Sequence, residues 1–147
     1  MSLEMEKNGL NYKGKYKKDI LWIALLGFFV FLLFWKAATL QGIFYSGDIR
    51  LVDLPFRWYT VYAVKQGISL YWNPLILCGY PYASDFLSGV FYPFTYVFFG
   101  LFKTPTAINY FQIFHYLLCG LGTYLYARII GLTNLASFCS GILFTFS

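Results

Sequence analysis

Long uncharged runs dominate the pattern of hydrophobic and polar positions along the chain. They lie at 20–35, 86–102 and 104–127. A hydrocarbon core of about 30 Å requires roughly 20 helical residues to span it. The pattern therefore predicts transmembrane helices at 20–40 and 105–130, and the start of another at 134–147.

The segment at 41–103 mixes polar and apolar positions, and we expect it to form a large loop with helices at the membrane surface. One such helix is expected to follow Asp53, which can cap it. It should end near Gln66, because Gly67 favours the left-handed conformation that stops a helix. Its apolar stripe is expected to face the membrane; the stripe comprises Leu54, Trp58, Val61 and Tyr62.

The apolar stretch at 86–102 leaves two possibilities open. It has 17 residues and contains Pro93. It therefore either crosses the membrane at the short limit for a span or forms a broken helix at the outer interface.

Charge sets the expected orientation of the chain. Five lysines fall within the first 19 residues, just before the first apolar run. Because cytoplasmic segments carry an excess of basic residues, we expect 1–19 to be a flexible cytoplasmic tail and 41–103 to lie outside the cell membrane. The predicted fold class is therefore all-α: a polytopic, multi-pass integral membrane protein whose partner is the lipid bilayer.

Charge distribution and residue spacing limit the partners and cofactors that we expect. The net charge of +5 is concentrated in the basic tail, so we expect no nucleic-acid partner. Cys78, Cys119 and Cys139 form no close pair, and His115 has no neighbouring ligand on its helix, so no cofactor and no metal ligands are expected. A bound divalent metal is left open. The chain stops inside an apolar stretch, and we expect it to be a fragment of a longer protein or a truncated gene product.

Charge returns in one short stretch of the expected outer loop, where Asp48, Arg50, Asp53 and Arg57 fall within ten positions. Two kinds of role are open for Asp48. It is either structural, as a helix cap or a solvated loop charge, or catalytic, as a general base that takes a proton from an acceptor hydroxyl. Asp53 can pair with Arg57 four residues on. Arg50 and Arg57 carry planar guanidinium groups suited to phosphate, either in ordinary lipid headgroups or in a lipid-linked sugar.

Aromatic and acidic side chains later in the loop extend this candidate site. Trp72, Tyr80 and Tyr82 can stack against a sugar ring, or they can anchor the loop at the membrane interface. Asp85 either joins the site or caps a helix that begins at Phe86.

A series of short motifs runs through the same loop. They are Gly47-Asp48, Pro55-Phe56, Trp72-Asn73-Pro74, Gly79-Tyr80-Pro81 and Tyr92-Pro93. In this order and spacing they resemble the first outer loop of the bacterial YfhO-like membrane proteins. The resemblance covers roughly residues 15–147 and implies the C-type (GT-C) glycosyltransferase-like superfamily of polytopic helical proteins.

The resemblance implies a function. Proteins of that superfamily use sugars carried on a polyprenyl phosphate and keep an acidic residue in the first outer loop, for which Asp48 is the counterpart. We therefore expect transfer of a sugar from a polyprenyl-phosphate donor to a cell-envelope glycan or teichoic-acid-type acceptor on the outer face. Asp48 is the expected catalytic residue. The expected substrate-binding residues are Arg50, Asp53, Arg57, Trp72, Tyr80, Tyr82 and Asp85.

An alternative of another class is a non-catalytic membrane protein, either a transporter or a subunit of an envelope assembly. Its charged loop would then only anchor the protein to lipid headgroups. The isolated fragment is expected to be inactive under either hypothesis.

Overall fold

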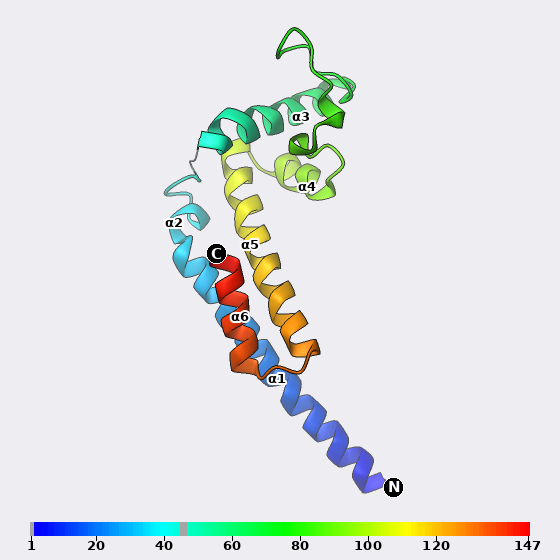
Figure 1. The fold of residues 1–147 in the computed structure, drawn as a ribbon, viewed down its shortest axis with the longest axis vertical. Coiled ribbons are helices and arrows are strands. Elements are labelled where there is room, and N and C mark those ends of the chain that lie inside the picture. Colours follow the sequence, from blue (N-terminus) through cyan, green and yellow to red (C-terminus); the bar gives the residue numbers. More distant parts are fainter. Residues whose placement is uncertain (1, 45–46) are drawn as a thin grey trace. The chain divides into compact units, whose positions relative to one another are not determined.

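The structure, a computed structural model, describes the backbone of residues 2–44 and 47–147 and the side chains of 17–44, 47–49 and 51–147. The elements in this part of the chain are all helical (Figure 1). Besides the α-helices there is one π-helical turn, η1, and two 3₁₀ turns, η2 and η3. In chain order the elements are α1 (Ser2–Leu33), α2 (Trp35–Ala38), η1 (Ile49–Asp53), α3 (Leu54–Gln66), η2 (Tyr82–Ser84), η3 (Phe86–Ser88), α4 (Pro93–Leu101), α5 (Thr104–Ile129) and α6 (Asn134–Phe146).

In the described part of the chain, no helix combines the length and the apolar composition that crossing a bilayer requires. The predicted fold of a polytopic integral membrane protein is therefore wrong. The physical reasons differ between helices. The uncharged part of α1, at 20–33, extends only about 21 Å. The helix α5 carries polar side chains such as Asn109, Gln112 and Arg128 along its length.

The chain divides into two units, and each has its own packing. One unit comprises 1–34 and 113–147, and the other comprises Trp35–Gln112. The second unit contains the whole segment that was expected to form a large outer loop with membrane-surface helices. Its side chains bury one another, so this segment folds around a core of its own.

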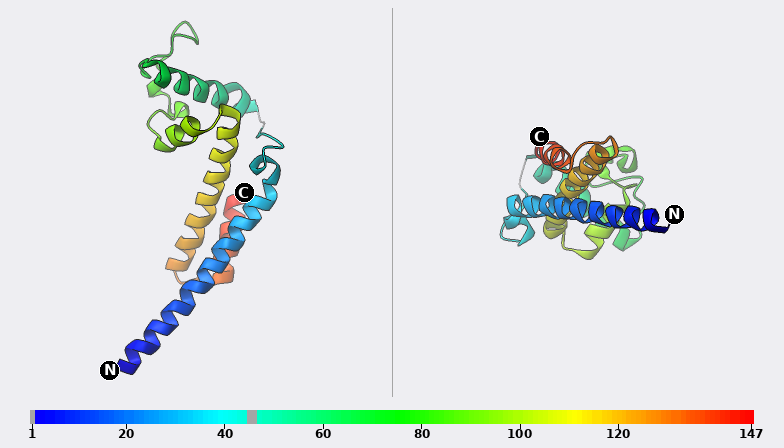
Figure 2. Two further views of the ribbon diagram at one scale, coloured as in Figure 1. Left: turned by 180° about the vertical axis from the view of Figure 1, so that it is seen from behind. Right: turned by 90° about the horizontal axis from the view of Figure 1, so that it is seen from below.

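In the unit of 1–34 and 113–147, α1, the later part of α5 and α6 lie side by side (Figures 1 and 2). They approach closely where Leu26 of α1 meets glycines on the other two helices. A Cβ atom added at Gly141 would lie 2.8 Å from Leu26 Cδ1 and 3.0 Å from the Gly120 carbonyl oxygen. Glycine at these positions therefore permits the contact between the helices.

A polar cluster joins the same three helices at one end of this unit. The Asp19 carboxylate accepts hydrogen bonds from Tyr124 Oη at 2.8 Å and from Arg128 Nε at 2.8 Å. It also accepts one from the Asn134 amide. Partial burial raises the pKa of Asp19, but these hydrogen bonds and the charge of Arg128 outweigh that effect and hold the pKa below its usual value.

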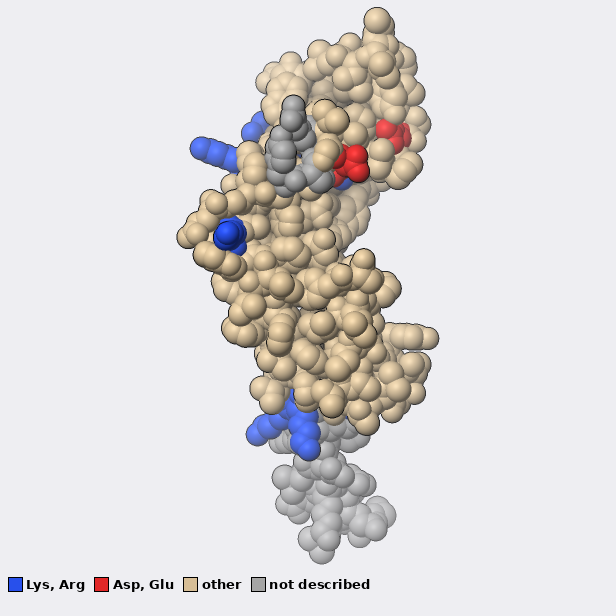
Figure 3. All heavy atoms as spheres, turned by 60° about the vertical axis from the view of Figure 1, so that its left-hand side comes forward, with Lys and Arg blue, Asp and Glu red and all other residues tan. Residues whose placement is uncertain are grey.

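Beyond its charged end, the unit has long uncharged stretches of helix. Between these end groups, 20–34 and 113–127 contain no Lys, Arg, Asp or Glu. Figure 3 shows the uncharged face, with basic side chains gathered at one end. Large apolar side chains such as Phe28 and Phe144 are more than half exposed on it, at 57% and 62%.

The unit of Trp35–Gln112 has two small hydrophobic cores. In the first, Tyr59 and Ala63 of α3 pack with Tyr82 of η2 and with Val90. In the second, Phe99 of α4 packs with Ala107 and Ile108 at the start of α5. The helix α3 contributes to both cores and lies against α4.

A buried amide fixes the 37–44 segment to α5 within this unit. Asn109 is fully buried, and its Nδ2 donates to the carbonyl oxygens of Ala37 at 3.0 Å and Gly42 at 2.7 Å. Its Oδ1 accepts from the Phe44 backbone N–H at 3.0 Å. One side chain thus satisfies three backbone groups that would otherwise lack partners.

Several helix ends lie where the sequence predicts them. The helix α3 ends at Gln66, and Gly67 adopts the left-handed conformation with φ +65°. The helix α6 begins at Asn134, as expected, and Thr133 caps it by accepting a hydrogen bond from the Ala136 N–H. The stretch at 86–102 forms the short elements η3 and α4, which is the broken arrangement rather than a single long helix.

Other local predictions need correction. The basic segment at 1–19 was expected to be flexible, but α1 begins at Ser2 and continues to Leu33. Asp53 does not cap α3, because its backbone is itself helical and continues from η1. The buried residues of α3 include Tyr59, Thr60 and Ala63. The predicted apolar stripe is partly exposed, with Trp58 at 50%, and its contact with a membrane stays a prediction.

Candidate ligand-binding site

The predicted site residue Tyr82 lies in the interior of the Trp35–Gln112 unit. It is fully buried, and its ring packs edge-on against Phe56 and Tyr59. Its hydroxyl donates to the Phe56 carbonyl oxygen and lies 2.7 Å from Thr60 Oγ1. Burial raises the pKa of Tyr82 to about 12, so the phenol stays neutral. The structure therefore places Tyr82 in the core, where its ring has no face open to a sugar.

Tyr80 and Asp85 lie close together, and their side chains hydrogen-bond to each other rather than standing open to a ligand. Tyr80 Oη donates to Asp85 Oδ2 at 2.6 Å, and this hydrogen bond raises the pKa of Tyr80. Asp85 Oδ1 accepts from the Leu87 N–H at 2.9 Å and so caps η3. The capping alternative for Asp85 is the one that the structure supports.

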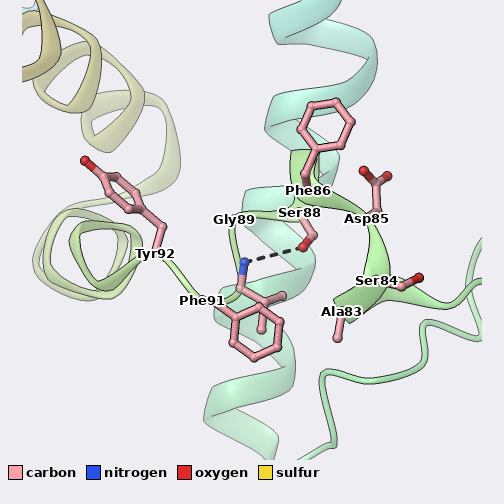
Figure 4. Close-up of a pocket in the computed structure, with 9 residues that line it drawn as sticks. Ala83, Ser84, Asp85, Phe86, Ser88, Gly89, Phe91 and Tyr92 are labelled. Atoms are coloured by element: carbon pink, nitrogen blue, oxygen red, sulfur yellow. Dashed lines mark hydrogen bonds between the residues drawn. The ribbon is translucent and has the colours of Figure 1, made fainter.

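A shallow hollow of about 430 Å³ lies beside Asp85. Figure 4 shows the chain curving so that Ala83, Ser84 and Asp85 lie across from Gly89 and Phe91. One short stretch of chain supplies the described lining, and among the described side chains no basic one contributes to it. The described lining therefore offers no cation to a phosphate group.

Trp72 lies at a tight turn. Asn73 and Tyr80 pair through backbone hydrogen bonds of 2.8 and 2.9 Å, and Asn73 Oδ1 accepts from Leu75 N. The Trp72 indole lies against Gly79, where an added Cβ would come within 2.3 Å of Cζ2. The residue as a whole stays 53% exposed. Trp72 is thus open to a ligand, but Tyr82 is not beside it as a second stacking ring.

Arg57 points into the unit rather than outward. Its Nη1 donates to the Ser88 carbonyl oxygen at 2.6 Å. Its guanidinium carbon lies 6.0 Å from the centre of the Phe99 ring and 5.6 Å from that of Phe111. Burial lowers the pKa of Arg57, while Asp53 acts to raise it. One donor of this arginine therefore serves the fold, and its side chain also lines a small pocket of about 50 Å³ with Asp53 and Gln112.

The acidic members of the charged stretch differ in their surroundings. Asp53 is partly buried, and this burial raises its pKa, against the effect of Arg57 and with a smaller contribution from Asp48. Asp48 is exposed and caps no backbone N–H of η1. The side chain of Arg50 lies outside the described residues.

A larger cleft between α3 and α4 combines aromatic and basic side chains. Its volume is about 490 Å³. Trp58 and Tyr62 stack at 5.3 Å between ring centroids with only 6° between their planes, and both are substantially exposed. Lys65 of α3 and Lys103, just after α4, also line the cleft. These four side chains form the candidate ligand-binding site, which we call the α3–α4 cleft.

From the sequence, Trp58 and Tyr62 were expected to belong to a membrane-facing stripe, and neither Lys65 nor Lys103 was a candidate site residue. The i, i+4 spacing of the two rings was the available signal, since it places them on one helical face. No residue near Lys103 in the sequence indicates that it lies close to the two rings, because that closeness depends on how α4 packs against α3. Among the described residues, no group of three His, Cys, Asp or Glu side chains is placed to hold a metal ion.

Comparisons with known proteins found no relative of this chain. No family model matches the chain, and neither a curated protein nor a solved structure matches it. The resemblance to the YfhO-like proteins therefore stays a prediction.

Proposed function

We propose that this chain binds a sugar carried on a lipid phosphate and takes part in its transfer to a cell-envelope acceptor at the outer face of the membrane. The observation that supports the binding step most directly is the α3–α4 cleft. In that cleft, a flat aromatic pair and two lysines share one opening.

The chemistry of the cleft matches the two parts of such a ligand. The exposed stacked rings of Trp58 and Tyr62 offer a flat apolar surface to the C–H face of a sugar ring. The ammonium groups of Lys65 and Lys103 can neutralise a phosphate. The same positive charge would favour departure of a phosphate leaving group, on which negative charge develops in the transition state.

Asp48 is the proposed general base for the acceptor hydroxyl. Its side chain is exposed and is not committed to capping η1, so it is accessible to an incoming acceptor. The role is proposed for Asp48 alone, since Asp53 is partly buried and Asp85 bonds to Tyr80 and Leu87.

A lipid carrier also suits the uncharged surface of α1, α5 and α6. Exposed Phe28, Leu143 and Phe144 belong to a surface that lacks charge over most of its length. Large exposed apolar surfaces mark sites of contact with protein or membrane. We propose that this surface contacts lipid.

Binding can be tested with a water-soluble, short-chain isoprenyl-phosphate sugar and isothermal titration calorimetry. The double variant Lys65→Gln/Lys103→Gln should bind at least fivefold more weakly, and its affinity should depend less on salt. Lys36→Gln is the matched control, because Lys36 is exposed but does not line the cleft. Unchanged affinity in the double variant would exclude the cleft as the phosphate site.

A non-catalytic binding role is the second candidate function. It is favoured because Arg57, Tyr82 and Asp85, three of the expected substrate-binding residues, make internal contacts. Asp48→Asn in the full-length gene, expressed at the normal level, distinguishes the two in complementation of an envelope-glycan defect. Loss of complementation with retained sugar-phosphate binding supports catalysis. Full complementation supports the non-catalytic role.

A further inference from the structure

A narrow hairpin follows α3 in the unit that contains α3 and α4. Figure 1 shows this green loop projecting away from both helices. At its base, Asn73 and Tyr80 pair through two backbone hydrogen bonds. Tyr59 of α3 donates to the Trp72 carbonyl oxygen at 2.9 Å. The base of the hairpin is therefore fixed to the fold, and residues 74–79 form its tip.

The tip of the hairpin exposes large apolar side chains. Leu75 is 62% exposed and Leu77 is 82% exposed, and the whole stretch at 66–84 contains no Lys, Arg, Asp or Glu. Tyr71 and Trp72, at the base, are also more than half exposed. Trp and Tyr favour the headgroup level of a bilayer. An apolar tip beyond two such side chains therefore matches the change in polarity across a membrane surface.

The backbone of the tip adopts a turn that suits its residues poorly. The Gly79 N–H donates to the Ile76 carbonyl oxygen at 2.8 Å, and φ is +50° at Leu77 and +58° at Cys78 between them. Positive φ at both central positions is the pattern of a type I′ turn, which favours Asn-Gly. An exposed leucine contributes little to a core, so the stability of the fold alone does not explain a leucine at this strained position.

A lipid surface fits the tip better than a protein partner does. A specific protein interface takes about 20–30 residues from each side, whereas the tip offers only 74–79. A bilayer requires no matching pocket, and each inserted apolar side chain contributes through its own area. The hairpin also pairs polar backbone groups internally, as an apolar environment requires. The Leu75 N–H donates to Asn73 Oδ1, and the Gly79 N–H donates to Ile76.

We propose that the hairpin at 71–80 inserts its tip into the boundary between the headgroups and the acyl chains of a lipid bilayer. Leu75 and Leu77 enter the apolar layer. Tyr71 and Trp72 lie among the headgroups. Because the tip is uncharged, insertion does not require anionic lipid. The hairpin contributes no residue to the described lining of the α3–α4 cleft, so the proposal does not rest on sugar-phosphate binding.

A fluorescent label on Cys78 reports on the tip alone. The three cysteines of the chain are all exposed, so Cys119→Ser/Cys139→Ser leaves one labelling site. The full chain carrying the environment-sensitive fluorophore NBD at Cys78 is titrated with vesicles of uncharged phosphatidylcholine. The emission should increase and shift to the blue, and lipid with a nitroxide on its acyl chain should quench it.

Leu77→Asn in the same labelled protein separates insertion from stability. Asparagine tolerates a positive φ, so the urea midpoint should be no lower than that of the parent protein. Half of the emission change should nevertheless require roughly tenfold more lipid, which is the lower end of what burial of one leucine side chain provides.

Leu51→Asn is the matched control for this substitution. Leu51 is 71% exposed in the same unit but lies outside the hairpin, so its replacement should leave the lipid requirement unchanged.

Two results overturn the proposal. One is an emission from the Cys78 label that vesicles leave unchanged. The other is a Leu77→Asn protein that requires no more lipid than Leu51→Asn. Calorimetry with the water-soluble sugar phosphate involves no bilayer, so failure of the cleft and failure of the hairpin are distinguishable.

Discussion

At the scale of single residues, the surroundings of Arg57 decide what the charged stretch can do. An arginine at a membrane surface is well suited to phosphate, and nothing adjacent to Arg57 in the sequence argues otherwise. In the structure its guanidinium lies against Gly89 and bonds to the Ser88 carbonyl oxygen. The contact is possible because Gly89 has no side chain and adopts φ +61°.

Gly89→Ala is therefore expected to destabilise the protein. A Cβ atom there would lie 2.0 Å from Arg57 Nη1, and alanine disfavours a positive φ. Displacing the guanidinium and straining the backbone should together lower the free energy of unfolding by about 2–3 kcal/mol. Urea denaturation followed by circular dichroism measures the change.

Gly122→Ala is the matched control for this substitution. Gly122 lies within α5, and a Cβ there would meet open space. Alanine in a helix interior is favoured by roughly 0.5–1 kcal/mol over glycine, so this variant should be as stable as the wild type or more stable. Equal stability of the two variants would show that Gly89 has no special role.

At the scale of elements, buried polar side chains hold the helices and loops together. Asn109 joins the start of α5 to the 37–44 segment through three hydrogen bonds. Asn109→Leu keeps a similar volume but leaves those backbone groups unpaired. We expect a loss of about 2–4 kcal/mol in the free energy of unfolding.

Thermal or urea denaturation of Asn109→Leu tests this expectation. Thr106→Val, also in the first turns of α5 but only partly buried, should change the stability by less than about 0.5 kcal/mol. A loss in Asn109→Leu no larger than that in Thr106→Val would contradict the anchoring role of Asn109.

The Asp19 cluster predicts a dependence of stability on pH. The pKa of Asp19 is lower in the folded protein than its usual value of 3.8. The carboxylate therefore stabilises the fold at pH values above 3.8. That contribution should be lost as the pH falls through the lower, folded-state pKa.

Urea midpoints measured between about pH 7 and pH 2.5 should therefore fall less steeply for Asp19→Asn than for the wild type. The asparagine variant should be the less stable of the two at neutral pH, because it lacks the charge that faces Arg128. Parallel pH profiles for both proteins would exclude Asp19 as the source of the dependence.

At the scale of the whole molecule, the uncharged surface of α1, α5 and α6 predicts adsorption to lipid. The protein should co-float with vesicles of uncharged phosphatidylcholine, and added salt should not release it, because burial of apolar surface is not screened. Phe144→Lys, at a position that is 62% exposed, should weaken the adsorption without unfolding the protein.

Lys17→Gln/Lys18→Gln is the control for the effect of charge, because it changes charged residues in the same unit as Phe144. Both lysines are exposed, and their replacement should leave adsorption to uncharged vesicles unchanged. If the protein does not float with vesicles at all, the proposed lipid contact is excluded.

Helix ends were readable from the sequence because they depend on neighbours along the chain. Gly67 and Thr133 act on backbone groups within a few residues, so their roles in α3 and α6 follow from local chemistry. The helical character of the chain follows in the same way. The membrane-spanning architecture did not, because uncharged runs such as 20–34 and 113–127 also serve helices that pack against one another, as α1, α5 and α6 do.

The candidate site depended on contacts between residues distant in the chain. Arg57 meets Ser88 31 positions away. Lys103 reaches the stacked pair of Trp58 and Tyr62 only because α4 packs against α3. Whether a charged or aromatic side chain serves the core or a ligand depends on the desolvation and pairing that its neighbours in space impose. Those neighbours exist only once the chain has folded.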